Sequence, residues 1–234
     1  MAARRSSDAL IARRLGVRDY MQTWRAMQDF SARRTPTTPD ELWLLEHPPV
    51  YTLGLKRATD ARTDIAGIPV VPADRGGDIT YHGPGQVIAY VLLDLTRRQL
   101  GVKELVHRLE QAVIDLLAGY EIGAARRAGA PGVYVAGRKI ASLGLRVRHG
   151  ASYHGLAFNH DMDLAPFAHI DPCGYAGLPV TCLADEITGG GGSGVTGEVI
   201  KPGREQIEGE LSAGIARNLD YNSMLWPDQD LTQK

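Results

Sequence analysis

A cysteine between a proline and a glycine is the residue in this chain best suited to nucleophilic chemistry. Cys173 stands in the run Asp-Pro-Cys-Gly, whose proline and glycine keep it out of regular structure and leave room for a substrate. A thiol becomes a nucleophile when a nearby cation, base or set of amides lowers its pKa from about 8.5. Many cysteines are instead small buried residues. Cys182, in an apolar and strand-like run, fits that description better, so Cys173 is the candidate nucleophile.

Lys139 is a candidate for the cation that such a thiolate needs. It begins a predicted strand directly after the turn Ala136-Gly137-Arg138. An ammonium group a few ångströms from a thiolate stabilises the charged sulfur, and it does so more strongly away from water. The ordinary alternative is a solvated lysine at the end of a hairpin.

Glycines mark two further regions where a ligand could approach the backbone. The stretch from Arg75 to Gln86 is neither a P-loop, because no Gly-Lys-Ser/Thr follows, nor a GxGxxG fingerprint. Its amides could bind an anion or an acyl carbonyl. Gly144 and Gly155 lie in the middle of neighbouring predicted strands. They either open a slot for an aliphatic chain or mark bulges.

The elements that position these residues form an α+β pattern with a mixed or antiparallel sheet. A last helix is expected around Arg204–Arg217, a flexible glycine-rich loop near 188–197 and a loose tail over 221–234, all within one domain spanning 1–234. Strands are predicted at 15–18, 41–45, 50–54, 68–71, 87–93, 132–135, 139–147 and 152–158, and helices at 19–32 and 102–119.

Composition excludes several classes of protein. The formal net charge is −1, so no overall field attracts nucleic acid or an anionic membrane, and no apolar run is long enough to span a bilayer. Two cysteines are too few for a disulfide scaffold, and neither has a zinc-ligand spacing. The arginine-rich start lacks an apolar signal core; its composition leaves a transit peptide open. A reduced, cytoplasmic protein without a metal is the simplest interpretation.

Five separated motifs resemble the octanoyltransferases of lipoate biosynthesis, in order through roughly residues 15–187. They are EHPPVYTLG (46–54), RGGDITYHGPGQVIAY (75–90), PGVYVAGRKIASLGLRVRHG (131–150), SYHGLAFNHDMDL (152–164) and DPCGYAG (171–177). The resemblance implies the fold of biotin and lipoate protein ligases and an acyl-cysteine intermediate. By position it makes Cys173 the nucleophile and Lys139 the residue that lowers its pKa. The octanoyl-binding residues that it implies are Arg75, Gly76, Gly77, Asp78, Ile79, Thr80, Tyr81, His82, Ser142, Leu143, Gly144, Gly155, Leu156 and Ala157.

The reaction implied by this resemblance is a ping-pong acyl transfer without a cofactor. Octanoyl-acyl carrier protein donates the acyl group. The acceptors are lysines on lipoyl domains of 2-oxoacid dehydrogenase complexes and on the glycine cleavage H protein. Backbone amides of the Arg75–His82 loop, or amides beside Cys173, are candidates for the oxyanion site. Either Lys139 or His82 is the candidate that takes the proton of the incoming amine.

Three other functions compete with this one. An ATP-dependent lipoate or biotin ligase would share the fold but need an adenylate site and not Cys173. A Cys–His hydrolase would use His82, His160 or His169 as its base and release free acid. A non-catalytic acyl-binding module would work without the thiol.

Overall fold

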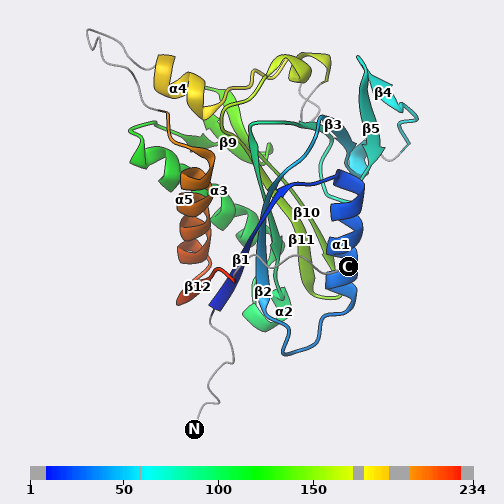
Figure 1. The fold of residues 1–234 in the computed structure, drawn as a ribbon, viewed down its shortest axis with the longest axis vertical. Coiled ribbons are helices and arrows are strands. Elements are labelled where there is room, and N and C mark those ends of the chain that lie inside the picture. The colour runs from blue at the N-terminus through cyan, green and yellow to red at the C-terminus, as the bar shows by residue number, and fades with distance from the viewer. Residues whose placement is uncertain (1–8, 58, 171–176, 190–200, 228–234) are drawn as a thin grey trace.

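The computed structural model describes residues 9–57, 59–170, 177–189 and 201–227. Two sheets carry the fold, with helices against both faces of the larger one (Figure 1). The larger sheet contains β1 (Ala9–Val17), β2 (Asp40–Glu46), β7 (Gln86–Leu92), β8 (Ala125–Arg126), β9 (Gly132–Val135), β10 (Arg138–Arg148), β11 (Ala151–Asn159) and β12 (Ser223–Leu225). The smaller sheet contains β3 (Val50–Leu53), β4 (Asp64–Ile65), β5 (Ile68–Pro72) and β6 (Ile79–His82).

The strand order of the larger sheet is β12-β1-β2-β7-β11-β10-β9-β8, and that of the smaller is β4-β5-β3-β6. β1 pairs in parallel with β2 and β12, whereas β2, β7, β11, β10, β9 and β8 pair antiparallel in turn. Both sheets are mixed, because β3 and β5 also run parallel. The predicted α+β class with a mixed sheet is therefore confirmed.

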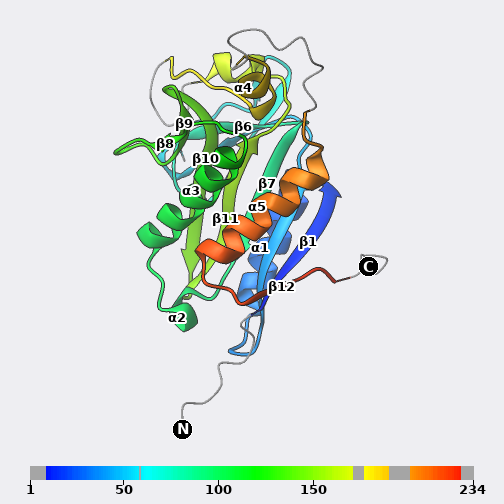
Figure 2. The ribbon, with the colours of Figure 1, turned by 90° about the vertical axis from the view of Figure 1, so that its left-hand side faces the viewer.

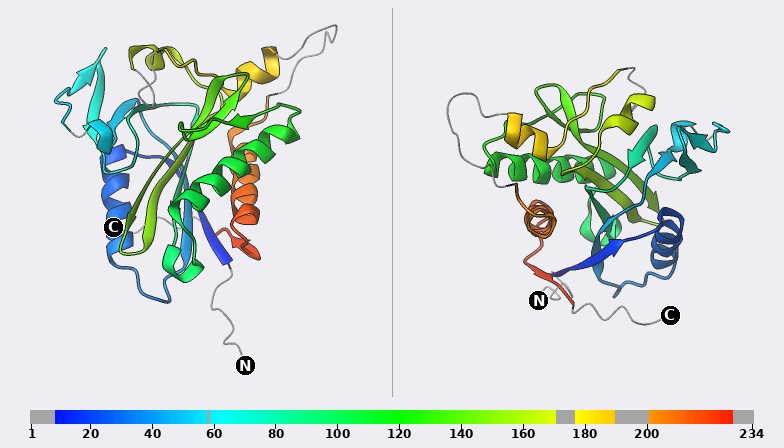
Figure 3. Two further views of the ribbon diagram at one scale, coloured as in Figure 1. Left: turned by 180° about the vertical axis from the view of Figure 1, so that it is seen from behind. Right: turned by 45° about the horizontal axis from the view of Figure 1, so that its top comes forward.

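The helices fall on opposite faces of the larger sheet. α1 (Tyr20–Ala32) covers one face, and α3 (Val102–Gly119) and α5 (Arg204–Asn218) lie side by side on the other (Figures 2 and 3). The short helices are α2 (Leu95–Arg98), α4 (Leu183–Gly189), η1 (Leu55–Arg57) and η2 (Ala165–His169).

Two tight turns fix the register of strands β9, β10 and β11. Ala136 and Gly137 connect β9 to β10, and His149 and Gly150 connect β10 to β11, all four with φ between 47° and 81°. Two consecutive left-handed residues make the type I′ turn that suits the right-handed twist of a hairpin. Both predicted hairpins are thus confirmed.

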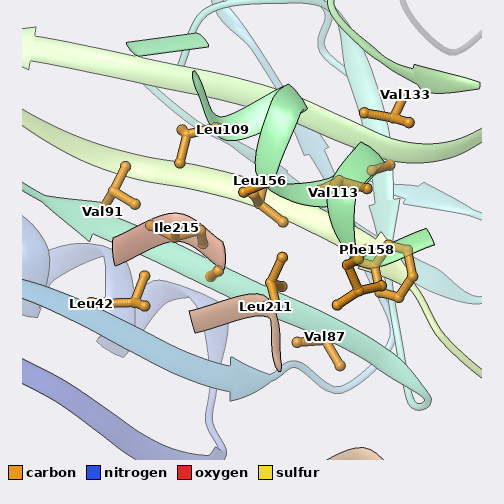
Figure 4. Close-up of a cluster of buried hydrophobic side chains, with 14 of the residues drawn as sticks. Leu42, Val87, Val91, Leu109, Val113, Val133, Leu156, Phe158, Leu211 and Ile215 are labelled. Atoms are coloured by element: carbon orange, nitrogen blue, oxygen red, sulfur yellow. The ribbon is translucent and has the colours of Figure 1, made fainter. Parts of the chain in front are cut away.

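The apolar core fills the space between the larger sheet and helices α3 and α5 (Figure 4). The side chains that meet there are mostly aliphatic. Successive residues of a strand point to opposite faces of the sheet, so the polar and aromatic residues between them lie on the other face. They include Leu42, Val87, Val91, Leu109, Val113, Val133, Leu156, Phe158, Leu211 and Ile215.

Several expectations from the sequence were wrong in detail. The first strand begins at Ala9 rather than Leu15. The described part of the expected loose tail, 221–227, contains β12, which pairs with β1, and residues 228–234 lie outside the described part of the chain. Cys182 does not lie in a strand. The only β-pairing described nearby is a single bridge between Val180 and Lys139, and Cys182 directly precedes α4. The expected glycine-rich loop overlaps α4 at 188–189, and its residues 190–197 lie outside the described part of the chain.

Candidate active site

A pocket lies over the central strands on the face that carries α1. It holds about 510 Å³ of space not filled by atoms, part of it open to solvent. The loop between β5 and β6 forms its roof, and strands β7, β10 and β11 form its floor. Its lining is Tyr20, Arg75, Gly77, Asp78, Ile79, Thr80, His82, Ile88, Tyr90, Ser142, Leu143, Gly144, His154, Gly155, Leu156 and Ala157.

The three segments expected to bind the acyl chain converge on this one pocket. Twelve of their fourteen residues line it, and the exceptions are Gly76 and Tyr81. Gly76 instead anchors the roof, since its N–H donates to the carbonyl of Leu145 at 2.9 Å. Tyr81 packs with Tyr51 and Phe167 in a separate apolar cluster. The convergence is structural, and acyl binding stays a prediction.

The two glycines in mid-strand face each other across β10 and β11. Gly144 pairs directly with Gly155, with no register shift on either side, so neither marks a bulge. A Cβ on Gly144 would lie 3.0 Å from the carbonyl oxygen of Gly76, and a Cβ on Gly155 would collide with the carbonyl of Ala89. Gly155 needs glycine because another backbone approaches closely, and at Gly144 a side chain would require the neighbouring loop to shift by a few tenths of an ångström.

A β-bulge places Lys139 on the pocket face of β10. Lys139 pairs with Tyr134, but the register shifts before Ala141 pairs with Val133. Ile140 and Ala141 both join the apolar core with Val133. Two residues therefore occupy one position in the alternation. Without this bulge, Lys139 and the pocket residue Ser142 would point to opposite faces of the sheet.

The side chain of Lys139 is enclosed, only 1% exposed. Its Nζ lies 5.6 Å from the centre of the Tyr134 ring, within cation–π range. Gly132, with φ of 144°, makes room for it: a Cβ there would lie 2.5 Å from Cε of Lys139. The buried carboxylate of Glu110 accepts the N–H of Gly132 at 2.9 Å and fixes this backbone. The solvated alternative for Lys139 is wrong.

Cys173 lies outside the described residues, but both flanks of its segment are placed. On one side Ile170 packs with Ile79, a pocket residue. On the other side Leu178 packs against Tyr134. Cys182 is 2% exposed, and burial raises the pKa of its thiol, as expected of a residue without a catalytic role.

The segment after Leu178 is held against Lys139 by backbone hydrogen bonds. The N–H of Lys139 donates to the carbonyl of Pro179 at 2.8 Å, and the N–H of Thr181 donates to the carbonyl of Lys139 at 3.0 Å. Val180 and Lys139 form a parallel bridge. The chain that follows the Cys173 segment is therefore tied to the strand that carries Lys139.

Arg75 is a buried cation that fixes the roof of the pocket. Its guanidinium donates to the hydroxyl and carbonyl oxygens of Thr52, at 2.7 and 2.6 Å, and to the carbonyl of Asp78 at 2.9 Å. All three of these acceptors are uncharged oxygens. The guanidinium can use them because the carbonyls of Thr52 and Asp78 point toward it. Arg75 thus orients the loop whose other residues line the pocket.

A hydrogen-bond chain fixes the tautomer of His82. The carbonyl of Thr181 can only accept, so Nδ2 of Asn159 donates to it and Oδ1 of Asn159 accepts from Nε2 of Gln86, both at 2.9 Å. Oε1 of Gln86 must then accept the Nδ1–H of His82 at 2.8 Å. In the neutral ring Nε2 carries no proton. Burial, together with the charge of nearby His47, lowers the pKa of His82 to about 3.

The other two histidines considered as bases do not line the pocket. Nε2 of His160 bonds to the carbonyl of Pro202 at 2.9 Å. His169 is exposed beside Arg57 and Arg62. The geometry therefore gives no support to His160 or His169 as the base of a hydrolase.

Four lining residues were missed by the sequence analysis: Tyr20, Ile88, Tyr90 and His154. The signal for Ile88 and Tyr90 was their alternation with Val87 and Ala89 in one strand. Tyr20 comes from α1, and only the packing of that helix brings it to the pocket. His154 precedes Gly155, yet its left-handed φ of 60° is not visible in the sequence.

Neither a metal centre nor a membrane span is found in the described part of the chain. No three histidine, cysteine, aspartate or glutamate side chains gather there as a metal site. None of the helices described is long and apolar enough to cross a membrane.

Comparison with known proteins gives the family. The family described as "Lipoyl protein ligase A/B catalytic domain" matches residues 19–196. An octanoyltransferase of Thiobacillus denitrificans is 66% identical over 177 residues, which are 76% of this chain and 81% of that protein. A bipartite lipoate protein ligase from Thermoplasma acidophilum has a similar fold, with a TM-score of 0.69, 14% identity, and 94% and 86% of the two chains covered. A biotin protein ligase from Aquifex aeolicus gives a TM-score of 0.51 at 14% identity, covering 92% and 71%. The resemblance seen in the five motifs is therefore confirmed, and the chain belongs to the octanoyltransferases within the lipoyl protein ligase A/B family.

Proposed function

We propose that this protein transfers an octanoyl group from octanoyl-acyl carrier protein to a lysine of a lipoyl domain, through a thioester on Cys173. The Cys173 thiolate attacks the donor's thioester carbonyl and releases the carrier's phosphopantetheine thiol. The acceptor amine then attacks the acyl-cysteine, forms an amide and releases the thiolate. The reaction needs no ATP, because the donor thioester already has the free energy that the amide requires. The acceptors would be 2-oxoacid dehydrogenase lipoyl domains and the glycine cleavage H protein.

One observation supports this proposal above the others: Lys139 and the pocket share a face of the sheet. The bulge at Ile140 turns the lysine toward that face, and the backbone of Lys139 holds the chain that follows the Cys173 segment. An aliphatic chain in the pocket would thus have its reactive end near a buried cation. A reduced cytoplasmic setting would keep the thiol free.

Lys139 would act first by stabilising the Cys173 thiolate. A buried ammonium beside a thiol lowers the thiol's pKa, since the Coulomb attraction is little screened away from water. Lys139 then gives its proton to the departing phosphopantetheine thiolate, and the neutral amine that is left is the better candidate for taking the proton of the incoming amine. Burial holds the pKa of His82 at about 3, so the imidazole is a weak base at neutral pH.

The oxyanion site can be narrowed from the hydrogen bonds of the roof loop. The N–H of Gly76 is used by Leu145, and the N–H of Ile79 is used by the side chain of Asp78 at 2.8 Å. These two amides are committed to the fold. The amides of Gly77 and Asp78, and those beside Cys173, are the candidates that would stabilise the tetrahedral oxyanion.

Intact-protein mass spectrometry tests the acyl-enzyme directly. The protein is mixed with octanoyl-acyl carrier protein without ATP, and we expect a mass gain of one octanoyl group. This adduct should be absent from Cys173→Ala, persist in the matched control Cys182→Ala, and discharge onto an added lipoyl domain. Octanoylation of the lipoyl domain only with ATP and free octanoate would show an ATP-dependent ligase instead. Release of free octanoate without an acceptor would show a hydrolase.

The role of Lys139 has its own test in the pH dependence of acylation. Lys139→Ala should slow acylation of Cys173 strongly at neutral pH and recover part of the rate as the pH rises toward 9, where an unassisted thiol ionises. Acylation by Lys139→Ala at the normal rate near pH 7 would contradict the proposed dyad. Arg138→Ala, at the exposed neighbouring position, is the control for general effects on β10.

A further inference from the structure

His154 departs from the alternation of its strand. In β11, Leu156 and Phe158 point into the apolar core, and a regular strand would send His154 to the same face. His154 instead has a left-handed φ of 60° and lines the pocket. A non-glycine residue with this φ is uncommon, and such residues concentrate where the surroundings hold them for a reason.

The register of the strands places His154 at the end of the pocket away from Lys139. Gly144 pairs with Gly155, and Leu145 pairs with His154, so His154 lies one step beyond the glycine pair. The Nζ of Lys139 reaches along the sheet to Gly132, which pairs with Ser142: a Cβ on Gly132 would lie 3.2 Å from that Nζ. At about 3.3 Å per residue, Ser142 and Leu145 are roughly 10 Å apart along β10, close to the length of an extended eight-carbon chain. The roof also touches the floor at this far end, where Gly76 N–H donates to the carbonyl of Leu145.

Asp74 holds the His154 ring in place. Its carboxylate accepts from Nε2 of His154 and from Nε1 of Trp24, both at 2.8 Å, and from the hydroxyl of Tyr153. Burial alone would raise the pKa of Asp74, but these hydrogen bonds outweigh it and hold the pKa well below its usual range. The imidazole is 1% exposed and contacts the Tyr90 ring edge-on, with centroids 5.9 Å apart. It is therefore a fixed wall.

We propose that the His154 ring, positioned by Asp74, closes the far end of the pocket and sets the longest acyl chain that the enzyme accepts. This inference rests on the proposed function, in which the acyl carbonyl lies near Lys139 and the chain extends toward Gly144 and Gly155. The last carbons of an eight-carbon chain would then meet the imidazole. A longer chain would have to displace a ring that Asp74 and Tyr90 hold.

His154→Gly tests this inference without adding strain, because glycine adopts a left-handed φ readily. Acylation rates of Cys173 are measured by mass spectrometry with hexanoyl, octanoyl, decanoyl and dodecanoyl carrier protein. We expect the decanoyl-to-octanoyl rate ratio to rise on the order of tenfold, since each newly buried methylene is worth about a factor of four. The matched control is His149→Gly, the same exchange at an exposed left-handed position in the β10–β11 turn, which should keep the wild-type ratio.

Two further variants keep the test independent of the stability of His154→Gly. His154→Asn also tolerates the left-handed φ but has a shorter side chain, and Asp74→Asn keeps the ring while weakening its anchor. Both should raise the ratio, by less than His154→Gly does. Folded variants that all keep the wild-type ratio, or that lose every chain length equally, would overturn the inference. If the wild-type protein forms no octanoyl adduct on Cys173, the proposed function fails and this inference falls with it.

Discussion

The two faces of the large sheet are built on different principles. In β7, Val87, Ala89 and Val91 point into an aliphatic core under α3 and α5 (Figure 4), whereas Ile88 and Tyr90 point toward α1 and the pocket. The first face is filled by close-packed hydrocarbon. The second, the polar face, combines an apolar cluster under α1 with buried histidines, tyrosines and Arg75, several of which are held by hydrogen bonds.

Two departures from regular strand geometry both change the face that carries the pocket. The bulge at Ile140 moves Lys139 to the pocket face, and the left-handed φ of His154 turns its ring to the same face. Both departures bring a polar side chain to the face that carries the pocket. We infer that packing on the aliphatic face supplies most of the free energy of folding. This stabilisation offsets the strain of the irregular backbone on the pocket face.

Gly132→Ala is the sharpest way to break the pocket face, and we expect the largest effect from it. The new Cβ would lie 2.5 Å from Cε of Lys139 and 2.7 Å from the carbonyl oxygen of Ala141. Lys139 must move, and a shift of about 1 Å at a reacting group can cost a hundredfold in rate. We expect acylation of Cys173 near pH 7 to fall at least about a hundredfold, measured by mass spectrometry over time.

Gly137→Ala is the control for this substitution. Gly137 also has a positive φ, of 81°, but a Cβ there meets nothing within 4 Å. The control also places an alanine at a positive φ in the same hairpin, and it leaves Lys139 in place. Equal loss of acylation in the two folded variants would show that strain in the hairpin, rather than the position of Lys139, is responsible.

Leu109→Ala tests the aliphatic face in the opposite sense. Leu109 lies on α3, fully buried among the core side chains. Truncation of a buried leucine leaves a cavity and costs about 3 kcal/mol. We expect the urea unfolding midpoint to fall accordingly, while the acylation rate per folded molecule stays close to that of the wild type. A native-like protein with greatly reduced acylation would mean that the two faces are coupled.

The sequence predicted the regular parts of both faces well, because alternation and turn chemistry are local properties. The hairpins around Gly137 and Gly150 follow from residues that accept a left-handed φ. The three segments expected to bind the acyl chain, however, came from the resemblance to a family. Only the fold could show that they meet, since the pairing of Gly144 with Gly155 depends on strand register.

The remaining features depend on contacts between distant segments. The bulge between Lys139 and Ala141 arises from pairing with β9, and β12 forms because Ser223 meets Ala9 across the whole chain. Within the expected loose tail, the strand over Ser223–Leu225 was not predicted, because local composition gives no sign of a pairing with a distant strand. Tyr20 was missed as a pocket residue because helical periodicity predicts only that it lies on the buried side of its helix. Periodicity does not show what that side contacts.

Acid should weaken the polar face selectively. Burial lowers the pKa of His47 to about 4 and that of His82 to about 3, from about 6.5 in an unfolded chain. Between the folded and unfolded pKa values the unfolded chain binds more protons than the folded protein does. The free energy of unfolding is therefore fully retained above pH 6.5 and falls as the pH decreases from 6.5 toward 4. Linkage gives a loss of about 2 kcal/mol per histidine between pH 7 and pH 5.

Urea unfolding at the two pH values measures this loss, and His47→Gln should reduce it by the share of one histidine, because burial lowers the pKa values of His47, His82 and His154 alike. His47 is bound on both sides, to the carbonyl of Arg18 at 2.6 Å and to the hydroxyl of Tyr90 at 2.8 Å. Glutamine does not titrate, so it removes one of the protonation events that favour the unfolded chain. A variant with the full wild-type loss of stability would place the acid sensitivity elsewhere in the protein.

Tyr20→Phe should have the smallest effect on stability. It tests whether the buried polar atoms of the pocket face all have hydrogen-bond partners. The Tyr20 hydroxyl is buried with no hydrogen-bond partner among the described residues, beside the pocket, and its ring stacks at 13° on His82. Phenylalanine keeps the ring and removes the unpaired hydroxyl, so we expect the free energy of unfolding to stay unchanged or rise by up to about 1 kcal/mol. Tyr51→Phe is the matched control, because the Tyr51 hydroxyl donates to the carbonyl of Pro166 at 2.7 Å and its loss should cost about 1 kcal/mol. Equal destabilisation by both would show that Tyr20 donates to a group held in the pocket, such as a bound water, and that this face is fully hydrogen-bonded before substrate arrives.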